Sequence, residues 1–317
     1  MKKIFFLFST VCIVGLWFWW THGTSAANPN ETATQNFVIA PGEGSKQVAD
    51  ELQQRSLIPD RFIFLLLSKF GGYDGKIQAG TFQLSASQTP GEILRVLAKG
   101  TADSWVTIPE GLRATEIAAI LKAKLPSYDT SWDAKLQANE GYLFPDTYSF
   151  AKDATVDQVI ATMRDNFQQK YAIAQKMQTN TLTKQQVVIL ASIVQREAIT
   201  PHDMQYVASV LENRLAIGMA LGSDVTIEYA LGYQPTTKTW WKQNLTADDL
   251  AINSPYNTRK YAGLPPTPIS NPGLVALEAV VAPPSSDYLY YLSDKKGVLH
   301  FAKTLAQHNA NISKYGE

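Results

Sequence analysis

The chain has 317 residues, of which 45% are hydrophobic and 18% charged, a globular composition with room for about two domains. Its 28 basic residues balance its 28 acidic residues, so no overall positive charge indicates a nucleic-acid partner. Cys12 is the only cysteine, which excludes an internal disulfide and a cysteine-based zinc site. We expect neither a metal nor a cofactor, because none of the four histidines has metal-ligand spacing: His22, His202, His300 and His308.

Residues 1–20 predict a transmembrane anchor. Lys2 and Lys3 precede an uncharged run of 17 residues, Ile4 to Trp20, at the short end of what crosses a bilayer. The lysines favour a cytoplasmic N-terminus, and the tryptophans that end the run suit the far interface. A signal peptide cleaved near Ser25 is the alternative, although bulky tryptophans are a poor lead-in to a cleavage site. Either interpretation places the body of the protein outside the cytoplasm, and the anchor predicts a single-pass protein of the cytoplasmic (inner) membrane.

Residues 21–36 are rich in small and polar residues and predict a flexible linker. Residues 37–104 then predict a small module with the order strand, helix, helix, strand, helix, which Gly100 ends. Residues 38–55 and 106–124 form a weak repeat. Each copy predicts a strand, a Pro/Gly turn and an amphipathic helix. The module resembles a LysM-like module, a small fold often associated with binding N-acetylglucosamine chains. A spacer that binds nothing is the alternative.

Residues 105–317 predict a second, helix-rich domain. Helices are expected at 155–177, 184–199, 201–217, 273–281 and 304–315, and a hairpin at 288–292 and 298–301. Residues 219–273 are rich in loops, with a further helix start at Thr246. Separate helices with short strands predict the α+β fold class.

The segment ASIVQREA places one carboxyl group, that of Glu197, on the apolar side of a helix. Thr183 and Gln186 have the spacing of a capping box, and Pro201 stops the helix soon after Glu197. Burial disfavours the charged form of an acid, and so does the negative end of the helix dipole. A raised pKa of Glu197 would suit a general acid near neutral pH. A partly exposed glutamate paired with Arg196 is the alternative.

Three segments combine aromatic rings, amides and hydroxyls with stiff turns: residues 140–150, 210–232 and 254–273. Aromatic faces stack on sugar rings, while amides and hydroxyls bond sugar OH groups, so these segments suit a glycan groove. Ser223, Asp224 and Thr226 are expected in a turn. Well-packed loops are the alternative, and packing is the favoured interpretation for Trp240 and Trp241.

Six motifs follow one another along the chain: EGYLFPDTY, ASIVQREA, VASVLENRLAIGM, SDVTIEYALG, SPYNTRKYAGLPPTPISNPG and YLYYLSDKKGVLHFAKTLAQHN. Together they resemble the endolytic murein transglycosylase family (MltG-like, formerly YceG-like) over nearly all of residues 37–315. The resemblance implies an enzyme that cuts peptidoglycan glycan strands internally, leaves 1,6-anhydro-muramyl ends and works beside the peptidoglycan synthases of elongation or division. It implies that Glu197 is the catalytic acid. The chain departs from the family at Gln195, where an acid is common, and at Arg259, where a tyrosine is usual.

Such a reaction needs one titrating group. Protonated Glu197 would donate to the glycosidic oxygen between N-acetylmuramic acid and N-acetylglucosamine, and its carboxylate would then take the proton of the muramyl C6 hydroxyl as that oxygen attacks C1. The residues expected to bind substrate or support the transition state are Asp224, Tyr256, Asn257, Thr258, Ser223 and Asn213.

Two other functions are consistent with the residues alone. A hydrolytic muramidase would pair Glu197 with a second carboxylate, Asp224 or Glu212, whose separation would set the stereochemistry. A non-catalytic scaffold, tethered to the membrane, would bind the cell wall through the LysM-like module.

Overall fold

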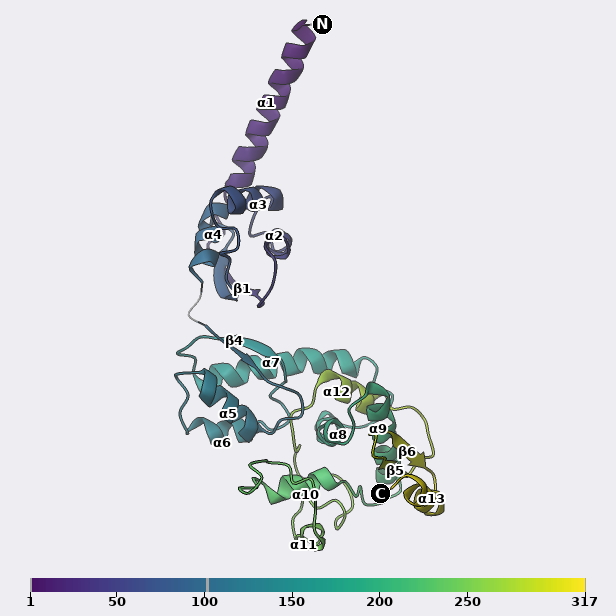
Figure 1. Ribbon diagram of the computed structural model, residues 1–317. Helices are drawn as coiled ribbons and strands as arrows, with labels where there is room; N and C mark the ends of the chain where they lie inside the picture. The colour runs from purple at the N-terminus through teal and green to yellow at the C-terminus, as the bar shows by residue number, and fades with distance from the viewer. Residues whose placement is uncertain (1, 101–102, 317) are drawn as a thin grey trace. The chain divides into compact units, whose positions relative to one another are not determined.

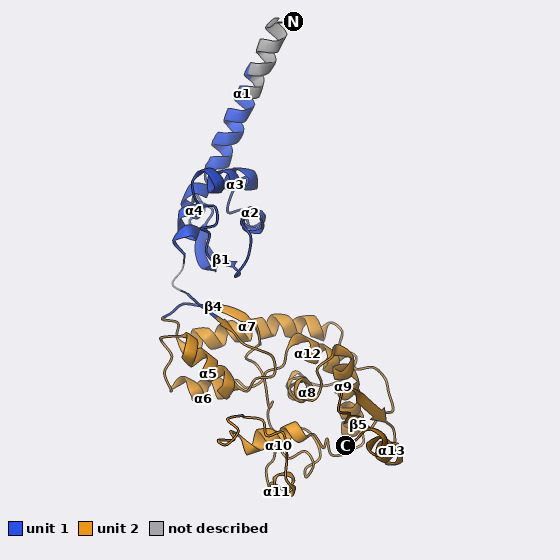
Figure 2. Ribbon diagram, in the orientation of Figure 1, with its two compact units in different colours: residues 1–105, 149–152 blue, residues 106–148, 153–317 orange. Residues whose placement is uncertain are grey.

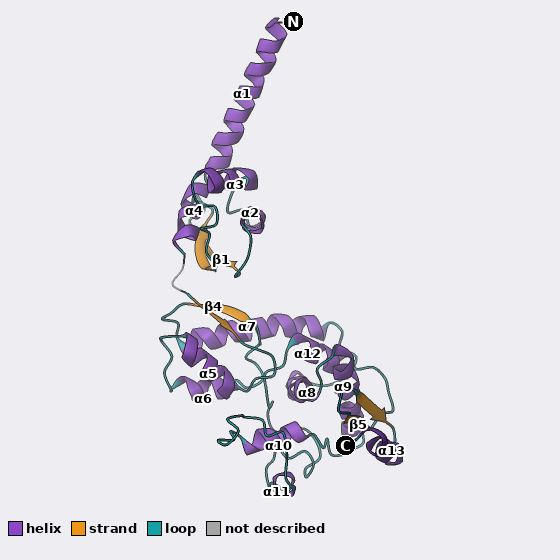
Figure 3. Ribbon diagram, viewed as in Figure 1, coloured by secondary structure: helices purple, strands orange, loops and turns teal. Residues whose placement is uncertain are grey.

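The computed structural model describes residues 2–100 and 103–316, with residues 2–9, 11 and 12 described by their backbone alone. The chain divides into two compact units, residues 1–105 with 149–152 and residues 106–148 with 153–317 (Figure 2). In the described residues, helices predominate and the strands form three two-stranded sheets (Figure 3). The α+β part of the fold prediction is therefore confirmed.

The first unit is built on one antiparallel strand pair. Strand β1 (Thr34–Ile39) pairs with β2 (Gly80–Ser85), with Phe37 opposite Phe82. The helices are α2 (Ser45–Gln54), α3 (Arg61–Phe70) and α4 (Pro90–Lys99). Their apolar faces share one buried core with Phe37 and Phe82. The order strand, helix, helix, strand, helix confirms the pattern expected for residues 37–104.

The predicted transmembrane helix is wrong. Helix α1 (Lys2–Thr24) covers the expected segment, but no helix of the described residues is long and apolar enough to cross a membrane. The predicted run, Ile4 to Trp20, has 17 residues, whereas a typical span needs about 20. Lys2, Lys3 and Cys12, which entered the membrane prediction, have side chains outside the described residues.

The end of α1 contacts the folded part of its own unit. The indole Nε1 of Trp19 donates to Asp60 at 2.9 Å, and Asp60 caps α3. Gly23 lies so close to Ile63 that a Cβ at this position would come within 2.5 Å of its side chain. Residues 21–36, expected to be a linker, contain the end of α1 and the start of β1.

Strand β3 (Ser104–Thr107) pairs with β4 (Thr147–Phe150), and the boundary between the two units falls within each of these strands. Two further strands, β5 (Tyr290–Ser293) and β6 (Leu299–Ala302), form the predicted C-terminal hairpin. The helices of the second unit are α5 (Ala114–Lys124), α6 (Trp132–Gln137), α7 (Val156–Gln175), α8 (Lys184–Glu197), α9 (Pro201–Ala216), α10 (Asp224–Leu231), α11 (Ala247–Leu250), α12 (Leu274–Val281) and α13 (Leu305–Tyr315).

Helix α8 is the centre of this unit. All its residues from Val187 to Val194 are buried, and they share one apolar core with residues of α7, α9 and α12 (Figure 1). Helix α12 packs against all three of these helices. A helix enclosed on every side is apolar all round, which explains why α8 has apolar residues on more than one face.

The loop-rich region differs from its prediction at one place that matters for the site. Residues 223–226, expected in a turn, begin α10, with Ser223 as N-cap and Asp224 in the first turn. An acidic residue there is favoured by the positive end of the helix dipole.

Candidate active site

Helix α8 ends at the candidate acid. Thr183 Oγ1 accepts from Gln186 N, and Gln186 Oε1 accepts from Thr183 N at 2.8 Å, so the predicted capping box is confirmed. The helix ends at Glu197, and Thr200 with Pro201 starts α9 three residues later. The capped start and the buried body of α8 therefore fix where the Glu197 side chain emerges.

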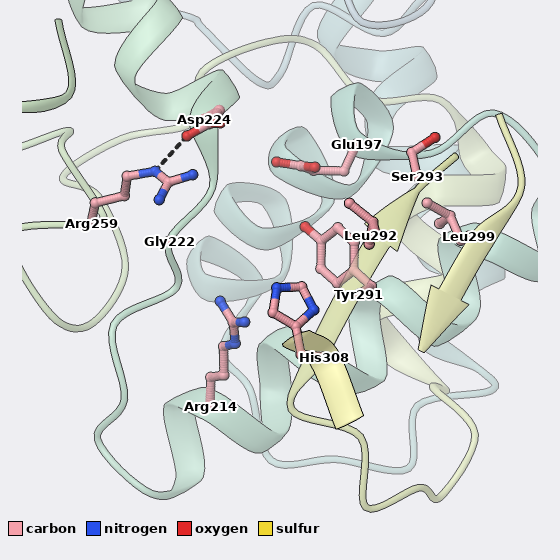
Figure 4. Close-up of a pocket in the computed structure, with 10 residues that line it drawn as sticks. All are labelled: Glu197, Arg214, Gly222, Asp224, Arg259, Tyr291, Leu292, Ser293, Leu299 and His308. Atoms are coloured by element: carbon pink, nitrogen blue, oxygen red, sulfur yellow. Dashed lines mark hydrogen bonds and ion pairs between the residues drawn. The ribbon is translucent and has the colours of Figure 1, made fainter. Parts of the chain in front are cut away.

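Glu197 opens on a cavity of about 390 Å³, the volume of a small-ligand site (Figure 4). The wall combines charged and apolar side chains from five parts of the unit, namely the end of α8, the segment from α9 to α10, the loop between α11 and α12, the C-terminal hairpin and α13. The residues that line it are Glu197, Arg214, Gly222, Asp224, Arg259, Tyr291, Leu292, Ser293, Leu299 and His308.

Two hydroxyl groups bond the Glu197 carboxyl group. Ser223 Oγ donates a short hydrogen bond to Oε1, and the Tyr291 hydroxyl bonds the same carboxyl group. Burial raises the pKa of Glu197 above its usual value, and this effect outweighs the two hydroxyls, which lower it. Asp224 raises this pKa further, whereas Arg214 lowers it. The site thus favours a protonated carboxyl group while keeping partners for its charged form.

Ser223 is held by buried hydroxyls. It is 1% exposed, its backbone N donates to Thr258 Oγ1 at 3.0 Å, and Thr258 Oγ1 lies 2.9 Å from Thr226 Oγ1. Gly222 N also donates to Thr258 O at 2.9 Å. Thr258 therefore acts on Glu197 indirectly, by fixing the residue that donates to it.

Tyr291 enters the site from strand β5. Burial and the neighbouring Glu197 raise the pKa of Tyr291 well above its usual value, so its hydroxyl keeps its proton. Arg214 connects the start of this strand to the segment before α10. Its Nε donates to Leu289 O at 2.6 Å, and its Nη1 donates to Leu221 O at 2.5 Å. The hairpin is thereby fixed against the segment that carries Ser223.

Asp224 and Arg259 form an ion pair on the opposite wall. Arg259 Nε donates to Asp224 Oδ1 at 2.6 Å, and both side chains are nearly half exposed. Figure 4 shows this pair facing Glu197 and Tyr291 across the cavity. Of the six predicted supporting residues, Asp224 lines the cavity and Ser223 bonds Glu197 directly.

The other predicted supporting residues point elsewhere. Asn257 is fully buried, and its amide donates to the carbonyls of Leu250 and Ile252 at 3.0 and 2.9 Å. The Tyr256 hydroxyl lies 2.6 Å from Thr267 Oγ1. Asn213 donates to backbone carbonyls of the loop before the hairpin, at 2.8 and 3.0 Å. These three side chains organise loops and do not line the cavity.

The segment 140–150, expected to border a glycan groove, contributes nothing to the cavity wall. Its Glu140 is only 8% exposed and accepts from Ala114 N at 2.9 Å and from the Asn271 amide at 2.8 Å. Burial raises the pKa of Glu140 to about 8, although these donors and Arg113 oppose it. Trp241, buried between Arg113 and Arg196, is packed as expected.

Five polar side chains of the cavity wall were not predicted as site residues from the sequence: Arg214, Arg259, Tyr291, Ser293 and His308. The predicted hairpin contained a cluster of tyrosines, which was the available signal for Tyr291, but nothing local tied it to Glu197. Among the described side chains, no group of three or more His, Cys, Asp or Glu residues could hold a metal ion.

Comparisons with known proteins agree with this arrangement. The chain is 31% identical to an endolytic murein transglycosylase of Bacillus subtilis, over 93% of this chain and 89% of that protein. It is 27% identical to an endolytic murein transglycosylase of Streptococcus pneumoniae, over 98% of this chain and 64% of that protein. A crystal structure described as a yceG-like protein from Listeria monocytogenes matches with a TM-score of 0.57 and 31% identity, over 87% of this chain and 98% of that one.

None of these names refers to a LysM module, so the LysM-like character of the first unit is not supported. The model of one family, described as the YceG-like family, matches residues 37–314, which include both the candidate acid and the whole cavity wall. The chain belongs to the YceG-like family.

Proposed function

We propose that this protein is a lytic transglycosylase that cleaves peptidoglycan glycan strands, with Glu197 as the group that gives and then takes a proton. The observation that carries the proposal is a single carboxyl group with a raised pKa, at the end of a buried helix, opening on a cavity and bonded by two hydroxyls. The names of the B. subtilis and S. pneumoniae relatives support the substrate class and the reaction class.

The proposed cut lies within the strand, at the β-1,4 bond between N-acetylmuramic acid and N-acetylglucosamine. Glu197 donates its proton to the glycosidic oxygen while the bond to C1 breaks. Because Ser223 donates to Oε1, we assign the transferred proton to Oε2. The hydroxyls of Ser223 and Tyr291 then stabilise the carboxylate that remains.

The second half of the reaction uses the substrate as its own nucleophile. The muramyl C6 hydroxyl attacks C1 and gives its proton to the Glu197 carboxylate, which closes the 1,6-anhydro ring and restores the acid. No water molecule is consumed, and no second carboxylate has to act as a base. Asp224 lies across the cavity from Glu197 and is our candidate for electrostatic stabilisation of the positive charge that develops at C1.

A muramidase remains the second candidate because Asp224 shares the cavity with Glu197. Glu212, the other carboxylate considered for that role, does not line the cavity and lies 3.5 Å from the Asn180 amide. Asp224 is already paired with Arg259, so its charge is partly neutralised, which favours a stabilising role over that of a nucleophile or base.

Mass spectrometry of digested strands distinguishes the candidates. Wild-type protein is expected to leave 1,6-anhydro-muramyl ends at internal positions of purified glycan strands. Reducing muramyl ends would establish the muramidase instead. Strands that are bound but never cut would establish a non-catalytic scaffold.

We further propose that the enzyme acts outside the cytoplasm, beside peptidoglycan synthases, and limits the length of nascent strands. The location of peptidoglycan and the family resemblance support this proposal. Replacing the chromosomal protein by its Glu197→Gln variant should lengthen the glycan strands of the cell wall, as chromatography of released strands would measure. Unchanged strand lengths would contradict the role in length control.

A further inference from the structure

We infer that Arg259 is a specificity-determining residue that binds a carboxylate of the substrate beside the cleaved bond. The inference rests on the proposed function, and it assigns to the cavity a preference for muramyl residues that carry a free carboxylate.

Arg259 has unused donors that face the cavity. Its Nε donates to Asp224 Oδ1 at 2.6 Å, and in the described part of the chain its two Nη groups have no hydrogen-bond partner. The Arg259 side chain is 45% exposed, so a ligand can reach it. Figure 4 shows the guanidinium group on the wall that faces Glu197. Asp224 thus holds the Arg259 guanidinium group in one orientation and leaves its two Nη groups available to a ligand.

Arg214 does not offer the same capacity. Its Nε and Nη1 donate to the carbonyl oxygens of Leu289 and Leu221, and its guanidinium group lies 5.4 Å from the centre of the Tyr290 ring. Through these contacts Arg214 joins the segment before α10 to the start of the hairpin. Arg259 is therefore the better placed of the two lining arginines to bind an anion.

The charge of the wall also favours an anion. When Glu197 is protonated, the charged lining residues are two arginines and one aspartate. Burial and the nearby Arg214 lower the pKa of His308, so this imidazole is uncharged at neutral pH. One positive charge remains uncompensated within the cavity, which attracts an anionic group more strongly than a neutral sugar ring.

The matching chemical group on a glycan strand is a carboxylate. The sugar rings themselves are neutral, but a muramyl residue carries either the carboxylate of its lactyl ether or, when a stem peptide is attached there, the carboxylates of that peptide. A guanidinium fork fits a carboxylate better than an ammonium group does, because it can donate two parallel hydrogen bonds. Both sources share this chemistry.

A binding experiment distinguishes the lactyl carboxylate from the carboxylates of the stem peptide. Soluble disaccharide fragments are titrated against the Glu197→Gln protein, which holds substrate without cutting it, with and without Arg259→Gln. Three fragments are compared: one with an intact stem peptide, one with a free lactyl carboxylate, and one whose carboxylates are all converted to amides. Arg259→Gln should weaken binding of a carboxylate-bearing fragment about tenfold and leave the amidated fragment unchanged. Arg259→Lys, which keeps the charge but loses the fork, should lie in between.

Lys260→Gln is the matched control, because it removes the same charge from the next residue. Lys260 Nζ bonds Asn253 at 3.2 Å and does not line the cavity, so all three fragments should bind as before. A selective loss with the peptide-bearing fragment identifies the stem peptide as the source, and a selective loss with the peptide-free fragment identifies the lactyl group. Equal weakening of all three fragments by Arg259→Gln, or none, would overturn the inference. The proposed function fails separately, if wild-type protein binds these fragments but leaves no anhydro ends on strands.

Discussion

Glu140 and Glu197 lie in the same unit, and burial raises the pKa of both, yet their surroundings differ. Glu140 accepts hydrogen bonds from Ala114 N and the Asn271 amide, and it does not line the cavity beside Glu197. Glu197 is bonded by two hydroxyls and opens on the cavity. A raised pKa therefore does not by itself identify a catalytic acid; a site for the group that receives the proton is also needed.

Arg113 and Arg259 differ in the same way as the two glutamates. Arg113 is 3% exposed, donates to the carbonyl oxygens of Tyr229, Glu228 and Trp240, and lies 4.0 Å from the centre of the Trp241 ring. Arg259 makes one ion pair and keeps donors open to the cavity. In one region the guanidinium group is buried and bonds carbonyl oxygens of the fold, and in the other its donors remain available for a ligand.

The largest expected effect is on the rate of strand cleavage, and it should differ between the two glutamates. Glu197→Gln should lower the rate of strand cleavage by about 10² to 10⁴, because the amide cannot give or take the proton. Glu140→Gln should keep the wild-type rate, since Glu140 lies outside the cavity and glutamine still offers an acceptor to Ala114 N. Release of anhydro-ended fragments, measured per folded molecule, tests both variants. Equal losses of rate would contradict the distinction.

The two arginines should differ in stability. Arg113→Ala leaves three carbonyl oxygens without their donor and opens a cavity beside Trp241, so the free energy of unfolding should fall by about 3 kcal/mol or more. Arg259→Ala removes an exposed side chain and should change it by about 0.5 kcal/mol or less. Urea unfolding of the two variants makes the comparison. An Arg113→Ala protein as stable as the wild type would refute the structural role.

Glu140 should also make stability depend on pH. Its pKa is about 8 in the folded protein and near the usual glutamate value of 4.5 in the unfolded chain, so between these values the folded state binds more protons. The free energy of unfolding should therefore decrease as the pH rises from about 5 to 8, by up to a few kcal/mol. Glu140→Gln should flatten this dependence in denaturant titrations across that range. An identical slope in both proteins would show that Glu140 does not carry the effect.

The Tyr291 hydroxyl should have a smaller effect on rate. Its hydrogen bond favours the carboxylate of Glu197, so Tyr291→Phe should raise the pKa of Glu197 further and shift the alkaline limb of the pH–rate profile to higher pH. The rate of strand cleavage itself should fall about tenfold through the loss of this hydrogen bond to a charged group.

Tyr288→Phe is the control, because Tyr288 packs against Tyr206 and Phe301 and does not line the cavity. This variant should keep both the rate and the pH profile of the wild type. A Tyr291→Phe protein with an unmoved pH profile would show that the hydroxyl does not set the pKa of Glu197.

Local rules predicted the parts of the site that depend on neighbours in sequence. The capping box at Thr183 and the stop at Pro201 fixed both ends of α8, and with them the place of Glu197. The order of elements in residues 37–104 followed from the same kind of signal. Tyr291 and His308 follow Glu197 by about a hundred residues and reach it only through the packing of the hairpin and α13. No local pattern encodes that contact.

One error and one unexpected side-chain placement have clear physical causes. Asn257 was expected to bind substrate because amides in aromatic loops suit sugars, but its amide closes its own loop through Leu250 and Ile252. Composition cannot distinguish an amide that faces a ligand from one that satisfies backbone carbonyls. The transmembrane prediction relied on the apolar run with its flanking lysines and tryptophans, and no local pattern in the sequence predicts the contact between Trp19 and Asp60.

The central claim is that Glu197 holds a proton at a carboxyl group that faces the cavity, and a titration of its side chain tests this most directly. Protein labelled with ¹³C at the glutamate carboxyl carbons is followed by NMR across pH, and the Glu197→Gln and Glu140→Gln variants assign the two signals. The account predicts that the Glu197 signal titrates above the usual range of a glutamate and moves higher in Tyr291→Phe. A Glu197 signal that titrates at or below the usual glutamate value of 4.5 would contradict it.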